Sequence, residues 1–190
     1  IIIMVKTNQT LILPEGQFNV EVLQFRTIDR QNLFSIYNKW RSLSNDLISI
    51  NGRGVNLPEA LSESTFCLEM NCVRVISSIS GANSSWDCYD LNRQKRIQVK
   101  ACSVLPDLTS FGPTSEWDEI YFMDFCKDGS WRGEFDIYLI ENDLIYNHRV
   151  NNNQTMREQQ LQKRRPRFSI YKDIIKRQNI EPVFSGGLNR

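Results

Sequence analysis

Residues 95–102 alternate between apolar and polar side chains, which is the pattern of a β-strand. One face of this strand would carry the apolar side chains of Ile97, Val99 and Ala101. The other face would carry the polar side chains of Arg96, Gln98 and Lys100. Because a single strand leaves its backbone donors and acceptors unpaired, this segment requires a sheet around it.

Neighbouring segments can supply that sheet. Four further runs are apolar-rich and bounded by turn-forming residues: 72–79, 86–89, 119–125 and 135–140. The spacing of apolar residues predicts helices over about 27–43 and 57–70, and residues 17–25 fit either a strand or the approach to a helix. We therefore predict an α/β chain, more narrowly α+β, with a central mixed β-sheet of about five strands flanked by helices.

The length of 190 residues suits one compact domain. Within it we expect an N-terminal helical segment over 1–55 and a core over 56–190 that ends in a basic segment. The apolar stretch 1–5 is too short to cross a bilayer and lacks the basic flank and cleavage site of a secretory signal. We expect an edge strand or a disordered end there, no membrane contact and a cytoplasmic location.

The inventory of reactive side chains excludes several kinds of catalytic site. His148 is the only histidine, which rules out a His-rich metal cluster and nearly excludes a His-based triad. The five cysteines have no metal-ligand spacing, and an odd number favours reduced, buried thiols over disulfides or a zinc site. Carboxylates, amides and lysines remain as the groups that can carry chemistry.

Positive charge is concentrated near the end of the chain, although the net charge is only +1. Residues 147–177 contain nine basic and two acidic residues, which predicts a basic surface on an otherwise acidic body. Arginine suits guanine, asparagine and glutamine suit adenine, and basic side chains neutralise phosphates. A solvated basic helix would have the same composition. If the segment binds DNA, the expected contacts are Arg149, Arg157, Arg164, Arg165, Arg167, Asn151 and Asn153.

A candidate catalytic centre lies where two predicted strands meet. Gln98 and Lys100 are two residues apart and project to the same side, and cross-strand pairing can bring Asp87 beside them. The Asp87 carboxylate, the Gln98 amide oxygen and the Val99 carbonyl form an oxygen-only set that suits Mg²⁺. Lys100 would orient the attacking water and stabilise negative charge in the transition state.

A second acid is expected on the helix over 57–70. Glu63 interrupts the apolar stripe of Ala60, Cys67 and Met70, and a carboxylate in a semi-buried stripe is costly unless a cation meets it. We therefore predict Glu63 as a further metal ligand, with Glu59 one turn earlier as the second choice. Both could instead be solvated helix acids, and the Asp, Gln and Lys could form only a polar sheet face.

Residues 57 to about 175 resemble type II restriction endonucleases of the PD-(D/E)XK nuclease superfamily. The resemblance is carried by NLPEALSE, SSWDCYD, RIQVKA, DLTSFGP, EIYFMDF, FDIYLI and the run from NDLIYNH to RRPRFSI. In that superfamily an acid on one strand precedes an (Asp/Glu)-x-Lys motif on the next. Here Asp87 and Gln98-Val99-Lys100 match it as a Gln-x-Lys variant, with Trp86 in place of the proline and Gln98 in place of the second acid.

The resemblance implies an Mg²⁺-dependent bacterial enzyme that cuts both strands of double-stranded DNA and leaves 5′-phosphates. It also implies a homodimer, a cognate DNA methyltransferase in the same system, and possible membership of a small group that cuts GCNGC. Two other functions fit the same residues: a structure-specific resolvase or repair nuclease, and a non-catalytic DNA-binding module in which Gln98 marks a decayed site.

Overall fold

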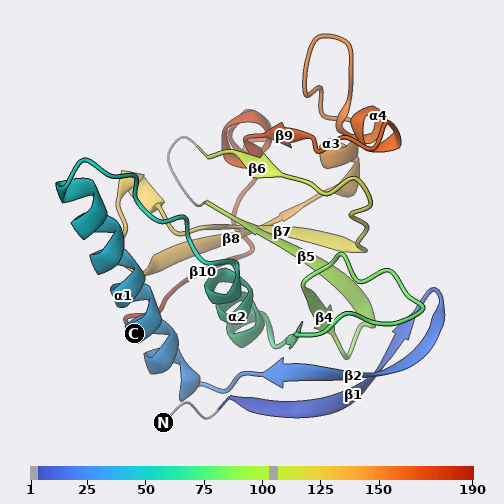
Figure 1. Ribbon diagram of the computed structural model, residues 1–190, viewed down its shortest axis with the longest axis horizontal. Helices are drawn as coiled ribbons and strands as arrows, with labels where there is room; N and C mark the ends of the chain where they lie inside the picture. The colour runs from blue at the N-terminus through green and yellow to red at the C-terminus, as the bar shows by residue number, and fades with distance from the viewer. Residues whose placement is uncertain (1–3, 103–106) are drawn as a thin grey trace.

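A large mixed sheet of eight strands crosses the centre of the computed structural model (Figure 1). The structure describes residues 4–102 and 107–190. In hydrogen-bonded order the strands are β1 (Val5–Leu13), β2 (Gly16–Gln24), β3 (Val73–Val75), β4 (Cys88–Asp90), β5 (Lys95–Ala101), β7 (Glu119–Asp124), β8 (Glu134–Ile140) and β10 (Phe184–Gly187). β5 and β7 run parallel, and the other neighbouring pairs are antiparallel. The predicted class and the mixed sheet are confirmed, but the sheet is larger than the predicted five strands.

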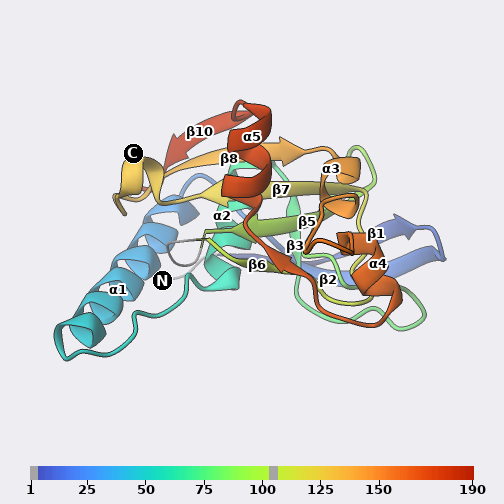
Figure 2. The same ribbon diagram turned by 90° about the horizontal axis from the view of Figure 1, so that it is seen from above.

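Helices cover both faces of this sheet. The helical elements are α1 (Asp29–Ser49), α2 (Glu59–Met70), the 3-10 turn η1 (Lys127–Gly129), α3 (Asn142–Tyr146), α4 (Met156–Leu161), the π-helical η2 (Tyr171–Ile175) and α5 (Lys176–Gln178). α2 lies against one face, and Figure 2 shows α4 and α5 over the opposite one. On that opposite side β6 (Thr109–Ser110) pairs with β9 (Arg167–Phe168) to form a second, smaller sheet.

The two sides of β5 are buried against different parts of the molecule. Ile97 and Val99 pack with Leu61 and Phe66 of α2, as the alternation of β5 predicts. The side of Gln98 is covered as well, and this side chain is only 2% exposed. The predicted polar face of the strand is therefore enclosed by the rest of the fold, which is an uncommon environment for uncharged amides without a specific role.

The N-terminal part of the chain differs from the prediction of a helical segment over 1–55. β1 and β2 form an antiparallel hairpin that extends the main sheet, and among residues 4–55 only α1 is helical. Alternate residues of the hairpin are buried, among them Leu11 and Val22, so packing against the sheet selects the extended conformation. The division of the chain at residue 55 remains a prediction, and residues 1–3 lie outside the described part.

Two other predictions concern the whole chain. Within residues 4–102 and 107–190, no helix combines the length and the apolar character that a membrane span requires. The five cysteines are all buried free thiols, as their number and spacing predict.

Candidate active site

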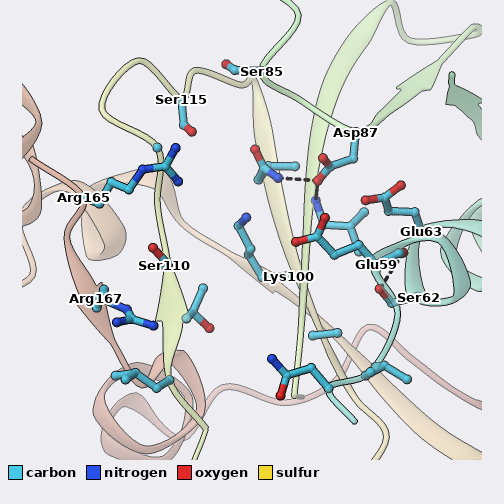
Figure 3. A pocket seen from close by; sticks show the side chains of 18 of the residues that line it. Glu59, Ser62, Glu63, Ser85, Asp87, Lys100, Ser110, Ser115, Arg165 and Arg167 are labelled. Atoms are coloured by element: carbon cyan, nitrogen blue, oxygen red, sulfur yellow. Dashed lines mark hydrogen bonds between the residues drawn. The ribbon is translucent and has the colours of Figure 1, made fainter. Parts of the chain in front are cut away.

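A groove of about 540 Å³ opens between the sheet, the first turns of α2 and the layer formed by β6 and β9 (Figure 3). Asp87, Gln98 and Lys100 all line this groove, so the structure brings the three predicted residues together. Asp87 comes from the segment just before β4, and the other two come from β5. Their convergence follows from the antiparallel pairing that places Cys88 opposite Ile97.

Hydrogen bonds fix the Asp87 carboxylate against β5. Its Oδ2 atom accepts the backbone N–H of Val99 at 2.8 Å and also accepts a hydrogen bond from the Gln98 amide. In a strand, the N–H and the carbonyl of one residue face the same edge. The Val99 carbonyl therefore points toward the same edge of β5 as Asp87, as a metal ligand there would require.

Burial makes the ionised form of Asp87 costly. Desolvation, followed by the negative charge of Glu63, raises the pKa of this carboxyl to about 7, although Lys100 and the Val99 N–H act in the opposite direction. A carboxylate in this position favours the binding of a cation, because the cation would replace the solvation that burial has removed.

Lys100 occupies the middle of the groove, between the acidic and the basic side chains (Figure 3). Its ammonium lies 5.7 Å from the centre of the Phe111 ring, within the range of a cation–π contact. Phe111 is fully buried. The aromatic ring therefore contacts the lysine without using any of its three hydrogen-bond donors.

Glu63 and Glu59 form the acidic wall on α2. The Glu63 side chain lines the groove and is paired with Arg74 of β3, whose Nε lies 2.6 Å from Oε2. Glu59, one turn earlier, is exposed and also lines the groove. The helix thus supplies both acids that the sequence proposed, and Arg74 meets the charge of the more buried one.

These groups fit a divalent cation of the Mg²⁺ type. The Gln98 amide faces Asp87 through Nε2, and its buried Oε1 atom has no hydrogen-bond partner among the residues that the structure describes. Rotation of this amide by 180° would turn Oε1 toward Asp87. In that orientation it would form a hard oxygen donor set with the Asp87 and Glu63 carboxylates. No group of three or more His, Cys, Asp or Glu side chains placed to hold a metal occurs in the described part of the chain, so such a site would depend on the amide and backbone oxygens.

Two arginines form the wall opposite the acids. Arg165 and Arg167 line the groove, and Figure 3 shows them across it from Asp87 and Glu63. Arg167 belongs to β9, where it pairs with Ser110 of β6. The groove is therefore acidic on one side and basic on the other, with Lys100 between them, an arrangement that can hold a phosphate beside a metal ligand set.

The other predicted DNA contacts lie away from the groove. Arg149 pairs with Thr155 in a bridge that closes a short hairpin, and the exposed Asn151 and Asn153 lie in its loop. Arg157 stacks 4.2 Å from the Tyr146 ring centre, and Arg164 Nη1 donates to the side chain of Gln154 at 3.4 Å. Figure 1 shows the hairpin projecting beyond the body of the molecule next to α4.

Several groove residues were not predicted from the sequence. Ser85, Ser110 and Ser115 contribute hydroxyl groups to the rim. Ser110 belongs to none of the strands or helices predicted from the sequence. The pairing of β6 with β9, which brings these residues to the groove, joins segments more than fifty residues apart and has no local sequence signal.

A buried carboxylate, a lysine and facing arginines in one groove are groups that can bind a phosphodiester and take part in its hydrolysis. Comparison with known proteins identifies the family. The chain belongs to the Bsp6I restriction endonuclease family, whose model matches residues 25–177. It is 34% identical over 150 residues to the type II restriction enzyme Bsp6I of Bacillus sp. (strain RFL6), a match that covers 77% of this chain and 81% of that relative. No solved structure matches the chain.

Family membership confirms the restriction endonuclease predicted from the sequence. The matched range contains α1, α2, the strands from β3 to β9 and the whole groove. The hairpin of β1 and β2 and the last strand, β10, lie outside it. The groove therefore lies in the part of the chain that the family shares.

Proposed function

We propose that the chain is an Mg²⁺-dependent type II restriction endonuclease with its hydrolytic centre at Asp87, Gln98 and Lys100. The observation that carries this proposal is the convergence of these three side chains in a groove whose opposite wall is basic. The strand order around the site is compatible with a PD-(D/E)XK core in which Gln98 replaces the second acid.

The acidic side of the groove would hold the metal. Asp87, Glu63, the Oε1 atom of Gln98 and the Val99 carbonyl are the proposed ligands, and Glu59 lies close enough to the rim to assist. When bound, Mg²⁺ would supply a Lewis acid that offsets negative charge on the scissile phosphate. Arg74 holds Glu63 in place in the absence of the ion.

The chain's own cations would position the DNA. Arg165 and Arg167 would bind phosphate oxygens from the wall opposite Asp87, since guanidinium groups pair with phosphates through two donors. Lys100 would donate to the attacking water and to the phosphate, which aligns the water and stabilises the developing charge. The hydrolysis adds water across the P–O3′ bond, so the products would carry a 5′-phosphate and a 3′-hydroxyl.

Sequence recognition is assigned to the basic segment in which the core ends. Arg165 and Arg167 line the groove. The hairpin at 149–155, with Asn151 and Asn153 in its loop, projects beyond the body of the molecule (Figure 1). We further propose a homodimer acting on a palindromic site, because a two-fold protein matches a two-fold site. A cognate methyltransferase and the GCNGC specificity belong to the same proposal, on the strength of the family resemblance.

Plasmid digestion tests the proposed function. Supercoiled plasmid is incubated with the purified chain in Mg²⁺, in Ca²⁺ and in EDTA, and the products are mapped by run-off sequencing. Discrete fragments with 5′-phosphates at one repeated short sequence, formed only with Mg²⁺, are expected. Cleavage confined to branched or damaged DNA, or DNA binding with no cleavage in Mg²⁺, would overturn the proposal.

A further inference from the structure

Residues 112–116, which we call the wall segment, connect the two sides of the groove. Residues 112–115 line the groove itself. The segment begins with a turn in which the Ser115 N–H donates to the Gly112 carbonyl at 3.3 Å. Hydrogen bonds from two different parts of the chain then hold this turn.

On one side the wall segment is attached to α4. The Nε2 atom of Gln160 donates to the Gly112 carbonyl at 2.8 Å and lies 3.4 Å from the Ser115 carbonyl. The Gln160 amide therefore contacts the carbonyls of the first and the last residue of this turn. Because α4 follows the hairpin at 149–155 and precedes Arg165, Gln160 ties the wall segment to the proposed recognition region.

On the other side the wall segment is attached to the loop that carries Asp87. The Ser85 hydroxyl accepts the Glu116 N–H at 3.0 Å, and the Asn83 amide donates to the Thr114 carbonyl at 3.2 Å. Asn83 Oδ1 also accepts the Ser85 N–H at 2.9 Å, which holds the two anchor residues together. Ser85 precedes Asp87 by two residues.

The two residues just before the wall segment contact the segment that carries Arg165 and Arg167. The Phe111 N–H donates to the Pro166 carbonyl at 3.0 Å, and Ser110 pairs with Arg167. A displacement of α4 or of residues 165–167 therefore has a direct hydrogen-bonded route to the loop before Asp87.

We propose that the wall segment couples two events: the binding of α4 and residues 165–167 to DNA, and the placement of the Asp87 carboxylate. Gln160 and Ser85 are its positioning residues. This inference rests on the proposed function. Correct seating of the recognition region would favour the arrangement in which Asp87 is aligned for hydrolysis, and poor seating on an incorrect site would not. The device would make the rate of cleavage, more than the affinity, depend on the DNA sequence.

The test compares rates and affinities of variants on defined DNA. Gln160→Met keeps the length of the side chain but removes the donor without adding a charge, and Ser85→Ala removes the acceptor at the opposite attachment. Leu161→Ala is the matched control, because Leu161 is the next residue of α4 and its side chain is 75% exposed. The probes are a duplex containing a cut site mapped on plasmid and the same duplex with one altered base pair. Single-turnover cleavage is measured in Mg²⁺ and the Kd for DNA in Ca²⁺.

We expect Gln160→Met and Ser85→Ala to lower the cleavage rate of the intact site by about 10-fold, the effect expected of a coupling network. The Kd should stay within about twofold of wild type, and cleavage of the altered site should fall less, so discrimination between the sites decreases. Ser85→Thr, which keeps the hydroxyl, should restore the rate, and Leu161→Ala should behave as wild type.

Unchanged cleavage rates in both variants, or equal losses on the two duplexes, would overturn the coupling role while leaving the nuclease assignment intact. A wild-type protein that makes no discrete cuts would overturn the proposed function, and this inference with it.

Discussion

The Asp87 carboxylate accepts the backbone N–H of Val99 across the strand boundary at 2.8 Å. This bond joins the acid proposed to hold a metal to the middle residue of the Gln98-Val99-Lys100 motif. It also fixes the side chain in a buried position, where its ionised form is poorly solvated. The position that we propose for cation binding is thereby a cost to the metal-free fold.

Removing this buried charge should stabilise the metal-free protein. The pKa of Asp87 is raised to about 7, mainly by burial, from an ordinary value of 3.8. When the pKa of an acid is higher in the folded than in the unfolded protein, the protein loses stability as the pH rises between these two pKa values. The full loss applies above the folded-state pKa. In EDTA, Asp87→Asn should therefore raise Tm over wild type at pH 8 and have little effect at pH 4. A gain that is equal at both pH values, measured by thermal unfolding, would contradict the buried carboxylate.

The ion pair between Arg74 and Glu63 predicts a metal-dependent rescue. Arg74→Ala would leave the Glu63 carboxylate without its partner and should cost about 1–3 kcal/mol in the free energy of unfolding without metal. The Arg74 side chain is 22% exposed, which keeps the loss below that of a fully buried pair. Because Mg²⁺ would supply the missing positive charge, it should raise the Tm of this variant more than that of wild type.

Arg93→Ala is the control for that rescue. Arg93 forms ion pairs with Asp90 and Glu119 at the other end of β5 and does not line the groove. Its variant should respond to Mg²⁺ as wild type does. Equal Mg²⁺ shifts in all three proteins would place the metal away from Glu63.

The arginine wall predicts a change in the salt dependence of DNA binding. Each phosphate contact contributes about 0.9 to the slope of log Kobs against log salt concentration, so Arg165→Ala should reduce that slope by roughly one unit. The measurement is a salt titration of affinity in Ca²⁺, with Arg132→Ala as an exposed arginine control outside the groove. If the slope is unchanged for Arg165→Ala and reduced for Arg132→Ala, the side of the groove formed by Arg165 and Arg167 does not contact DNA.

The core of the site could be predicted because its geometry is local. Asp87, Gln98 and Lys100 lie on neighbouring antiparallel segments joined by a short turn, so alternation and pairing determine which side chains share a face. The apolar face of β5 was predicted in the same way. Glu63 followed from its interruption of a helical stripe, and the structure places it on the groove wall.

Contacts between distant segments could not be predicted. The partner of Glu63 is Arg74, and nothing in the spacing of these residues shows that β3 passes beneath α2. The pairing of β6 with β9 brings Arg167 beside Ser110 across a separation that no periodicity records. The hairpin of β1 and β2 was missed because residues 17–25 alternate only partly, and burial of Val20 and Val22 against the sheet decides their conformation.

Single-turnover cleavage by Lys100→Ala tests the central claim most directly, with Lys95→Ala as the matched control on the same strand. Lys95 is exposed and lies outside the groove, whereas Lys100 lines it. In Mg²⁺, Lys100→Ala should cut mapped DNA ~10²–10³-fold more slowly than wild type, with a nearly unchanged Kd in Ca²⁺. Lys95→Ala should cut at the wild-type rate. If Lys100→Ala cuts as fast as Lys95→Ala, the groove at Asp87 is not the hydrolytic centre.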